Sequence, residues 1–400
     1  MTLNKTLALI ACAGMCVPAA NAAVSLSDDT LKLEFGVRLQ TRASMERGDD
    51  SAGNEFNIER GVRGKNDPVN FMMRRTRLYA KGTYQENWKF QFAIQGDDIE
   101  RQANSGAASV RYAWVERQLK MGESLTHVIH FGLDKPFFND ADIISSSAML
   151  MPTKRATEAH ILKNRSVGLG YRLWHPMFAL GADIQNVGGR VQPTANNVAD
   201  NESEGFFYSA RGEFSFSPEW FVAKRAESYC GKEGHAAVLG LEYGTERDRF
   251  TAINAQRTTS AYGGDILFWW NSITAIADLK WQKAETTTLP AGTVAPEVKA
   301  QVFTAQIGYA IPLEGGMAIE PAFRYAKIDT DTSTAAKDAP QNFSTAAFAE
   351  HGQSGSEFEV GLNLYMNGHG NKLSLQYSNW KANDGDARAS IFRLQHQLNF

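Results

Sequence analysis

Apolar and polar residues alternate along most of this chain, and the alternation restricts the folds open to it. Near the C-terminal end, one parity holds the apolar or aromatic residues Phe392, Leu394, His396, Leu398 and Phe400. The intervening parity holds Arg393, Gln395, Gln397 and Asn399. Successive side chains of a strand point to opposite faces of its sheet, so each such segment predicts a strand with one apolar and one polar face. The fold is therefore expected to be all-β.

Segments of this kind recur along the whole chain and predict about sixteen strands. They cover residues 30–44, 70–83, 86–97, 109–120, 126–134, 163–173, 177–187, 204–216, 234–245, 262–270, 272–285, 299–311, 316–328, 354–367, 370–382 and 388–400. These lengths suit tilted strands that cross a membrane, and bacterial barrels have an even number of strands. The expected fold is a transmembrane antiparallel β-barrel.

The connections between these segments alternate between short and long. Short connections fall at 83–85, 174–176, 271, 312–315 and 368–369, and long ones at 45–69, 98–108, 135–162, 188–203, 246–261, 286–298 and 329–353. Short periplasmic turns and longer external loops are typical of outer-membrane barrels, whereas a soluble sandwich has no reason to keep this order. One connection on the short side, 217–233, is long, and the pattern offers no explanation for it.

The N-terminal segment predicts secretion. Lys5 precedes a short apolar stretch, and Ala20 and Ala22 form an A-x-A cleavage site. Residues 1–22 are therefore expected to be a signal peptide, and residues 23–400 a single outer-membrane barrel domain. Of the 3 cysteines only Cys230 lies beyond this segment, so no internal disulfide is expected. A lipoprotein signal around Cys12 is the weaker interpretation of the same segment.

Composition and motifs exclude several classes of function. The formal net charge is −3, so no strongly basic field indicates binding to nucleic acid. The 8 histidines show neither an H-E-x-x-H pattern nor another paired metal spacing, and no G-x-S-x-G motif is present. We therefore expect no enzymatic activity, no catalytic residues, no cofactor and no metal site.

Basic residues are frequent on the parity expected to face the lumen. They are Lys32, Arg38, Arg42, Arg75, Arg77, Lys81, Lys89, Arg172, Arg211, Lys280, Arg324, Lys372 and Arg393. Rings of Arg and Lys select anions in pores, and the Arg fork matches phosphate oxygens. Acidic residues share this parity: Glu34, Asp97, Asp278, Glu320 and Glu359. A lumen in which these charges neutralise one another is the alternative to a ladder of anion sites.

The third long connection, 135–162, differs from the others because it is moderately apolar and contains "SSSAMLM". This composition favours a partly helical loop that folds into the barrel. Lys135, Lys154, Arg155 and Arg165 lie in it or beside its ends, where they would line a constriction. The alternative is a set of rim residues that bind surface anions.

Three stretches carry a resemblance to a known family. They are "FMMRRTRLYAKGTYQENWKFQFAIQGDD" (71–98), "VRYAWVERQL" (110–119) with "FGLDKPFF" (131–138), and "ILKNRSVGLG" (161–170). Together they resemble the phosphate-selective porin O and P family over about residues 30–175. The resemblance places the family's Arg pair at Arg74 and Arg75, with Arg77 after it. It also places the family's Glu at Glu116, its loop-opening Lys at Lys135, and the Arg that follows the loop at Arg165.

The resemblance implies a homotrimer of sixteen-stranded outer-membrane porins in a Gram-negative bacterium, each with an inward-folded third loop. It also implies passive diffusion of small anions, phosphate and polyphosphate among them. The expected pore-lining anion sites are Arg38, Arg75, Arg77, Lys81, Lys135, Lys154, Arg155 and Arg165. The alternatives are a general, non-selective porin and a non-conducting barrel that acts as an adhesin or structural protein.

Two further partners are expected at the ends of the barrel. Arg74 has the outward parity near the external rim, where it would meet lipopolysaccharide phosphates. Phe400 ends the chain on the lipid-facing parity of the last strand, which resembles the signal that barrel assembly machinery recognises.

Overall fold

The structure is a computed structural model. It describes residues 24–49, 56–57, 62–63, 70–96, 108–157, 161–162, 165–187, 205–217, 226–250, 255–288, 297–331, 354–383 and 388–400. The expected signal peptide, 1–22, lies outside the described residues, as does most of each of the long connections 45–69, 98–108, 188–203 and 329–353.

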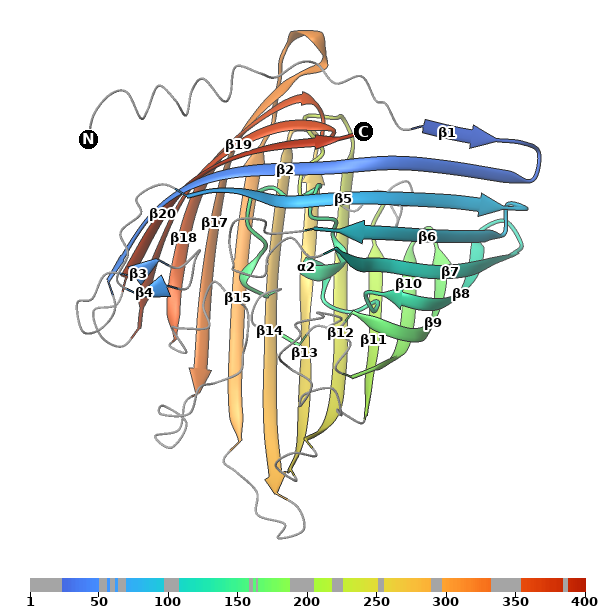
Figure 1. Ribbon diagram of the computed structural model, residues 1–400, viewed down its shortest axis with the longest axis horizontal. Helices are drawn as coiled ribbons and strands as arrows, with labels where there is room; N and C mark the ends of the chain where they lie inside the picture. Colours follow the sequence, from blue (N-terminus) through green and yellow to red (C-terminus); the bar gives the residue numbers. More distant parts are fainter. Residues whose placement is uncertain are drawn as a thin grey trace.

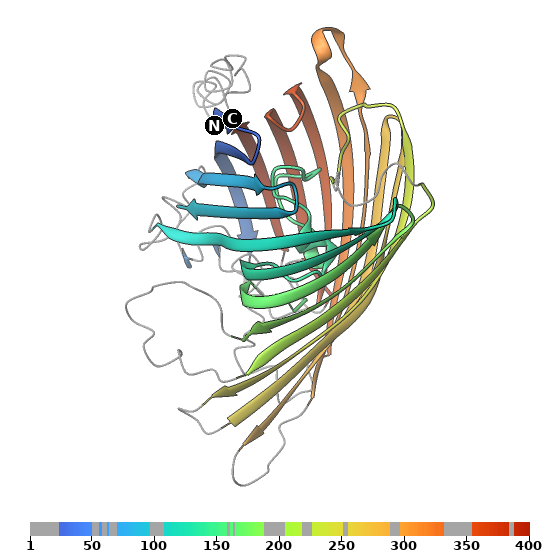
Figure 2. The ribbon, with the colours of Figure 1, turned by 90° about the vertical axis from the view of Figure 1, so that its right-hand side faces the viewer.

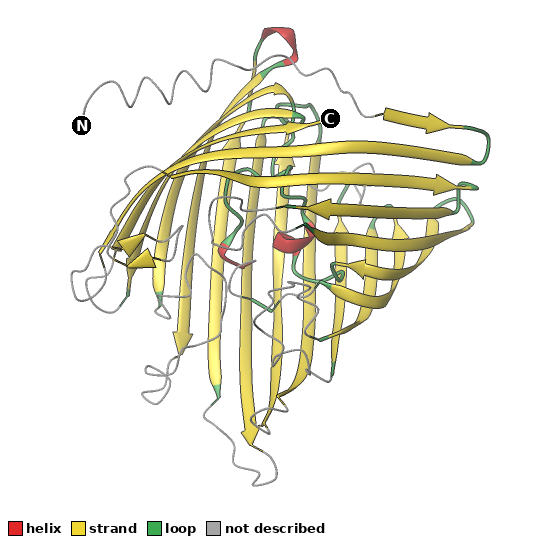
Figure 3. Cartoon of the chain, viewed as in Figure 1, coloured by secondary structure: helices red, strands yellow, loops and turns green. Residues whose placement is uncertain are grey.

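Strands make up nearly all of the described chain (Figure 3). The strands that form the ring are β2 (Leu31–Asp49), β5 (Asn70–Tyr84), β6 (Trp88–Gln95), β7 (Ser109–Met121), β8 (Leu125–Asp134), β9 (Ser166–His175), β10 (Phe178–Asn186), β11 (Phe206–Ser215), β12 (His235–Phe250), β13 (Ala255–Trp270), β14 (Ile273–Thr288), β15 (Val298–Tyr309), β17 (Ala318–Asp331), β18 (Gly355–Asn367), β19 (Asn371–Ala382) and β20 (Arg388–Asn399). The shorter elements are β1 (Val24–Ser27), β3 (Phe56–Asn57), β4 (Val62–Arg63), α2 (Asp140–Ile143), β16 (Ile311–Pro312) and the 3-10 turn η3 (Glu314–Gly316).

The described strands close into a barrel of 16 antiparallel strands, as the alternation predicted (Figures 1 and 2). Each strand of the ring pairs with the next along the chain, and β2 pairs with both β5 and β20. The last residue completes the closure, because Phe400 N–H donates to the Val37 carbonyl at 3.0 Å and Val37 N–H donates to the Phe400 carbonyl at 2.5 Å. Closure leaves the ring without an edge strand, which removes the unpaired backbone groups that lipid cannot satisfy.

The distribution of apolar side chains over the two faces of the barrel is that of a membrane protein. Large apolar side chains on the outer face are exposed, as in Phe131 and Leu241, whose exposed fractions are 56% and 61%. Polar side chains on the opposite parity are buried, among them Gln376 and Gln397. An apolar outer band around a polar interior is the arrangement that lipid requires.

The structure corrects one expected connection. Residues 246–261 were expected to form a long loop, but β12 continues to Phe250 and β13 begins at Ala255. The sequence is mostly polar at both parities here, as in "TERDR" (245–249), so it carries no apolar alternation. β2 continues in the same way to Asp49, beyond the expected end at residue 44.

A β-bulge lies in the densest basic stretch. Gln40 of β2 pairs with Arg75 of β5, whereas the next residue, Thr41, pairs with Met73. Arg74 is the extra residue at this shift. It is half-buried, and Arg75 and Arg77 on either side of Thr76 are buried. Bulges redirect side chains locally, and this one brings Met72 to the inner face together with Arg75.

No helix among the described residues is long and apolar enough to span a membrane.

Candidate pore constriction

The first part of the third long connection, residues 135–157, contacts the inner face of the barrel, and we call it the L3 segment. It follows β8 and contains α2. Beyond α2 it has almost no regular structure, so its backbone carbonyls need partners outside the segment. Figure 1 shows α2 within the outline of the strands.

Inward-facing polar side chains supply those partners. Carbonyls of residues 146–153 accept hydrogen bonds from side chains of five neighbouring strands, β2, β17, β18, β19 and β20. The bonds are Gln40 to Ser146 O (3.3 Å), Gln397 to Ser147 O (3.0 Å), Lys372 to Met149 O (2.7 Å), Asn363 to Leu150 O (2.8 Å), Arg42 to Pro152 O (2.8 Å) and Arg324 to Thr153 O (3.2 Å). The lumen-facing residues of these strands therefore hold an irregular segment in one position.

Two of the expected anion sites meet at the start of this contact. Arg38 and Arg77 are direct cross-strand partners on β2 and β5. Their guanidinium groups both donate to the Ser146 hydroxyl, at 3.2 and 3.1 Å. Arg75 lies one inward position away and donates to Gln40 Oε1 at 2.5 Å. Like charges directly opposite each other are unfavourable in a sheet, so this pair is a candidate for a function other than stability.

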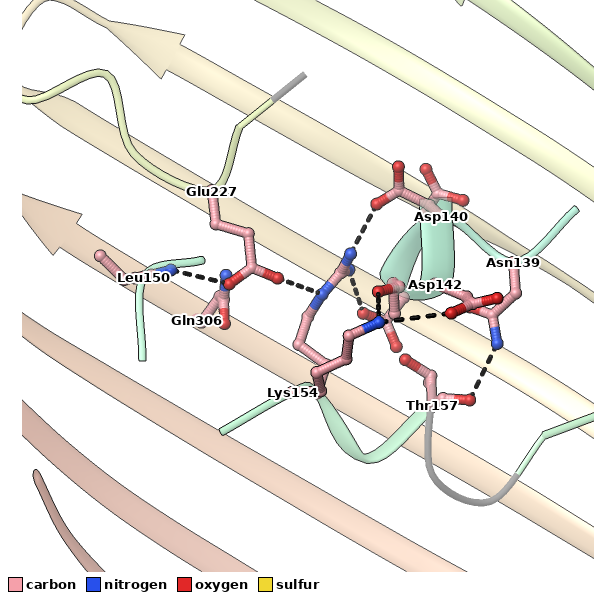
Figure 4. A network of polar contacts seen from close by, with 12 residues as sticks. Asn139, Asp140, Asp142, Leu150, Lys154, Thr157, Glu227 and Gln306 are labelled. Carbon is pink, nitrogen blue, oxygen red and sulfur yellow. Dashed lines mark hydrogen bonds and ion pairs between the residues drawn. The ribbon is translucent and has the colours of Figure 1, made fainter. Parts of the chain in front are cut away.

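Lys135 and Lys154 converge on one carboxylate, although 18 residues separate them along the L3 segment. Their ammonium groups lie 3.0 and 3.3 Å from Asp142 Oδ1 (Figure 4 shows the contact with Lys154). The pKa of Lys135 is lowered to about 8, mainly by burial and also by the neighbouring Lys154 and Arg165, while Asp142 and Tyr112 oppose the shift. Two cations thus share one acid at this point, and one of them titrates close to physiological pH.

Arg155 lies in a different environment, which the sequence did not indicate. Its side chain is fully buried, and it contacts Asp140 at 2.6 Å, Asp278 at 2.6 Å and Glu227 at 3.0 Å. Burial alone would lower its pKa, but Asp278, Asp140 and Glu227 outweigh burial and raise the pKa well above the ordinary value. Three carboxylates around one guanidinium anchor the L3 segment, so the geometry assigns Arg155 a structural part.

The lumen wall near Arg155 is neutralised in the same manner. Arg211 contacts Glu213 and Asp265, each at 2.7 Å, and it also contacts Glu242. Lys280 pairs with the same Glu242, and Arg324 lies 3.0 Å from Glu359. In the wall from β11 to β18 these basic side chains are therefore paired with carboxylates, which is the alternative to a ladder of anion sites.

The last two expected sites lie away from Ser146. Lys81 is exposed, and its ammonium group lies 4.7 Å from the centre of the Tyr79 ring. That ring covers Gly36, where a Cβ would come within 2.2 Å of the ring atoms. Arg165 is half-buried, and its guanidinium lies 5.2 Å from the centre of the Tyr112 ring. Arg111, the neighbour of Tyr112, also lies over this ring, at 5.7 Å.

Sequence reasoning missed Glu227, which belongs to the unexplained connection 217–233. Its carboxylate accepts a hydrogen bond from Leu150 N–H at 2.9 Å and pairs with Arg155 (Figure 4 shows Glu227 facing Leu150). The only available signal was the unusual length of a connection on the short-turn side. Length indicates an added element but not where that element goes.

No group of three or more His, Cys, Asp or Glu side chains placed to hold a metal ion occurs in the part of the chain that the structure describes.

Three solved structures with a similar fold are distant from this chain in sequence. An anion-selective porin from Comamonas acidovorans aligns with a TM-score of 0.54 at 10% identity, over 92% of this chain and 100% of that one. The outer membrane channel DcaP of Acinetobacter baumannii aligns with a TM-score of 0.53 at 14% identity, over 94% and 99%. The outer membrane protein OmpT of Vibrio cholerae, folded in vitro and solved in a trimer form, aligns with a TM-score of 0.51 at 12% identity, over 93% and 100%.

At these identities the structural likenesses show the fold alone, and a comparison with curated protein sequences finds no match. The family is shown by sequence. The model of the family described as "Phosphate-selective porin O and P" matches residues 52–400, which is most of the chain and extends well beyond the region of the initial resemblance. The chain belongs to this family and is a porin of the Gram-negative outer membrane.

Proposed function

We propose that this porin lets small anions, phosphate and polyphosphate among them, diffuse passively across the outer membrane. The observation that supports the proposal most strongly is the arrangement at Ser146. There, Arg38 and Arg77 on neighbouring strands both reach the L3 segment, and Arg75 follows one inward position away. A narrow passage beside clustered guanidinium groups favours anions.

The proposed mechanism is stepwise exchange of water for protein donors. An anion that enters from the long-connection side would meet Lys135 and Lys154 first and the guanidinium groups of Arg38, Arg75 and Arg77 next. Arg binds phosphate oxygens through two parallel N–H groups, and Lys contributes a point charge. Each site must bind weakly enough to release the ion, so transport needs no coupled energy source.

Arg155 is left out of this pathway. Its donors already bind Asp140, Asp278 and Glu227, and an anion would have to displace a carboxylate to reach them. Lys81 and Arg165 are proposed as residues on the approach and not at the narrowest point, because Lys81 is exposed and lies over the Tyr79 ring, whereas Arg165 lies over the Tyr112 ring.

The proposed partners follow from the assignment of this chain as an outer-membrane porin. The Vibrio cholerae OmpT structure in a trimer form supports a homotrimer here. Lipopolysaccharide phosphates near Arg74 and recognition of Phe400 by the barrel assembly machinery complete the proposal.

A general porin is the second candidate, and the neutralised wall favours it. Arg211, Lys280 and Arg324 are each paired with carboxylates, so this part of the lumen contributes little net charge. If the pairing extended to every basic group in the ion path, the pore would pass cations and anions alike.

Block of single-channel chloride current by phosphate tests the proposal. Purified protein in a planar bilayer should show chloride current that added phosphate reduces in a saturable way. Chloride current that phosphate does not affect would favour the general porin. Absence of any conductance would favour an adhesin or a structural barrel.

A further inference from the structure

Residues 226–231 of the unexplained connection enter the barrel interior from the short-turn rim, and we call them the inner latch. It lies between β11 and β12. Short turns of outer-membrane barrels lie on the periplasmic side. The inner latch and the L3 segment therefore come from opposite rims of the same barrel.

The two segments meet through one backbone hydrogen bond and the side chain of Glu227. Glu227 N–H donates to the Ala148 carbonyl at 2.8 Å, and Leu150 N–H donates to Glu227 Oε2 at 2.9 Å. The other carboxylate oxygen, Oε1, accepts from Arg155 Nε at 3.0 Å. One acidic residue thus binds the L3 segment at three points, which span residues 148–155.

The inner latch is fixed to the wall on its other sides. The Ser228 hydroxyl donates to Glu320 of β17 at 2.9 Å, and the Ser228 carbonyl lies 2.9 Å from His369 Nε2 in the β18–β19 turn. The Tyr229 ring stacks on Trp269 of β13, with ring centres 4.1 Å apart. These contacts connect the inner latch to three separate places on the barrel.

Glu227 is well suited to transmit this fixation to the L3 segment. Its exposed fraction is 2%, and the guanidinium of Arg324 lies 3.8 Å away, in addition to Arg155. A buried carboxylate between two guanidinium groups is held in one position. If it moved, its negative charge would lie unpaired in a site of low dielectric, which is energetically costly.

We propose that the inner latch is a second element of the constriction, and that Glu227 is the positioning residue that holds residues 146–153 of the L3 segment in place. The inference depends on the proposed function where it concerns ion selection, because Ser146 accepts the hydrogen bonds of Arg38 and Arg77. The claim that the inner latch positions the L3 segment does not depend on the proposed function.

Replacement of Glu227 by Gln tests the positioning role. Glu227→Gln removes the charge and turns one acceptor into a donor, so that contact with Leu150 N–H and Arg155 cannot both persist. Single-channel current should become noisier, with more frequent transitions between sublevels, because residues 146–153 lose their support. Glu233→Gln is the matched control. It is exposed in the same connection, undergoes the same chemical change, and should behave as the wild type.

Cys230 supplies a readout that does not depend on ion selectivity. It lies in the inner latch, is partly buried, and its pKa is raised to about 12, mainly by burial and next by Glu320. A charged thiol reagent should modify folded wild-type protein slowly. In Glu227→Gln the rate of Cys230 modification should rise about tenfold or more. A hydrogen bond to a charged group stabilises the closed position of the latch by an amount that corresponds to about this factor.

Unchanged current noise together with an unchanged rate of Cys230 modification in Glu227→Gln would overturn the proposal. If this variant fails to assemble, Tyr229→Leu loosens the same latch from the Trp269 side without changing a charge. It should also speed modification and increase noise, and wild-type values for both would overturn the proposal. A pore that proves non-selective while both readouts change would refute the anion pathway and leave the latch intact.

Discussion

Lumen-facing basic residues of this barrel serve two purposes that their parity does not distinguish. Arg155 and Arg211 are enclosed by carboxylates and stabilise the folded interior. Arg38 and Arg77 are cross-strand neighbours that reach the same hydroxyl of the L3 segment. The period of two in a strand predicted that Arg38, Arg77 and Arg211 face inward, whereas Arg155 lies in the L3 segment, where no strand parity applies. It could not predict partners across the lumen. Arg155 finds its three carboxylates 15, 72 and 123 residues away along the chain.

Removal of the β5 guanidinium groups should weaken anion binding. Arg75→Ala combined with Arg77→Ala should reduce the affinity of the open pore for phosphate about tenfold or more, because each charge-assisted hydrogen bond contributes on the order of 1.5–3 kcal/mol. Phosphate block of chloride current measures this affinity. Lys283→Ala, which removes an exposed cation on β14, is the control and should leave block unchanged. Equal block in the double variant and the wild type would take this cluster out of the mechanism.

Lys135 should give the pore a pH dependence. Its pKa of about 8 means that its positive charge disappears as the pH rises through that value. Anion preference should therefore fall over this interval. Lys135→Arg keeps the charge at every pH in this range, so the step should vanish in that variant. Reversal potentials recorded across the interval measure the effect. The same step in both proteins would assign it to another group.

At the scale of elements, the strands were predictable, whereas the contacts made by the segments inside the barrel were not. Alternation marks a strand only where one face meets lipid, so it located the membrane part of each strand. It failed for the ends of β12 and β13, where the sequence is mostly polar at both parities. The L3 segment and the inner latch have no periodic pattern. Their positions depend on hydrogen bonds to side chains such as Lys372 and Glu320, which come from distant strands.

The L3 segment should resist proteolysis in intact cells. Residues 146–153 are held by side chains of five strands, so a protease outside the cell has no extended, mobile substrate there. Mass spectrometry of cells treated with a broad-specificity protease should find no cleavage within 135–157. Rapid cleavage in this interval would place the segment outside the pore and contradict the constriction.

At the scale of the whole molecule, closure of the ring depends on the last strand. β20 pairs with β19 on one side and with β2 on the other, and Phe400 completes the pairing at Val37. The alternation of the final residues predicted both the closing strand and its lipid-facing parity. Closure converts sixteen amphipathic strands into one structure with an apolar outside and a polar inside.

Loss of the final residue should impair insertion of the barrel. Deletion of Phe400 removes two backbone hydrogen bonds to Val37 and the terminal aromatic side chain. The amount of folded protein in the outer membrane, measured by its heat-modifiable mobility on gels, should fall sharply. Phe400→Trp keeps a terminal aromatic residue and should assemble. Normal assembly of the deletion variant would refute the proposal that the barrel assembly machinery recognises Phe400.

The reversal potential in a planar bilayer under a KCl gradient, measured before and after phosphate is added, tests the central claim most directly. An anion path along Arg38, Arg75 and Arg77 predicts a potential on the chloride side and a current that phosphate reduces. A potential near zero or on the potassium side would contradict anion selection, and the protein would then be a porin that does not select anions.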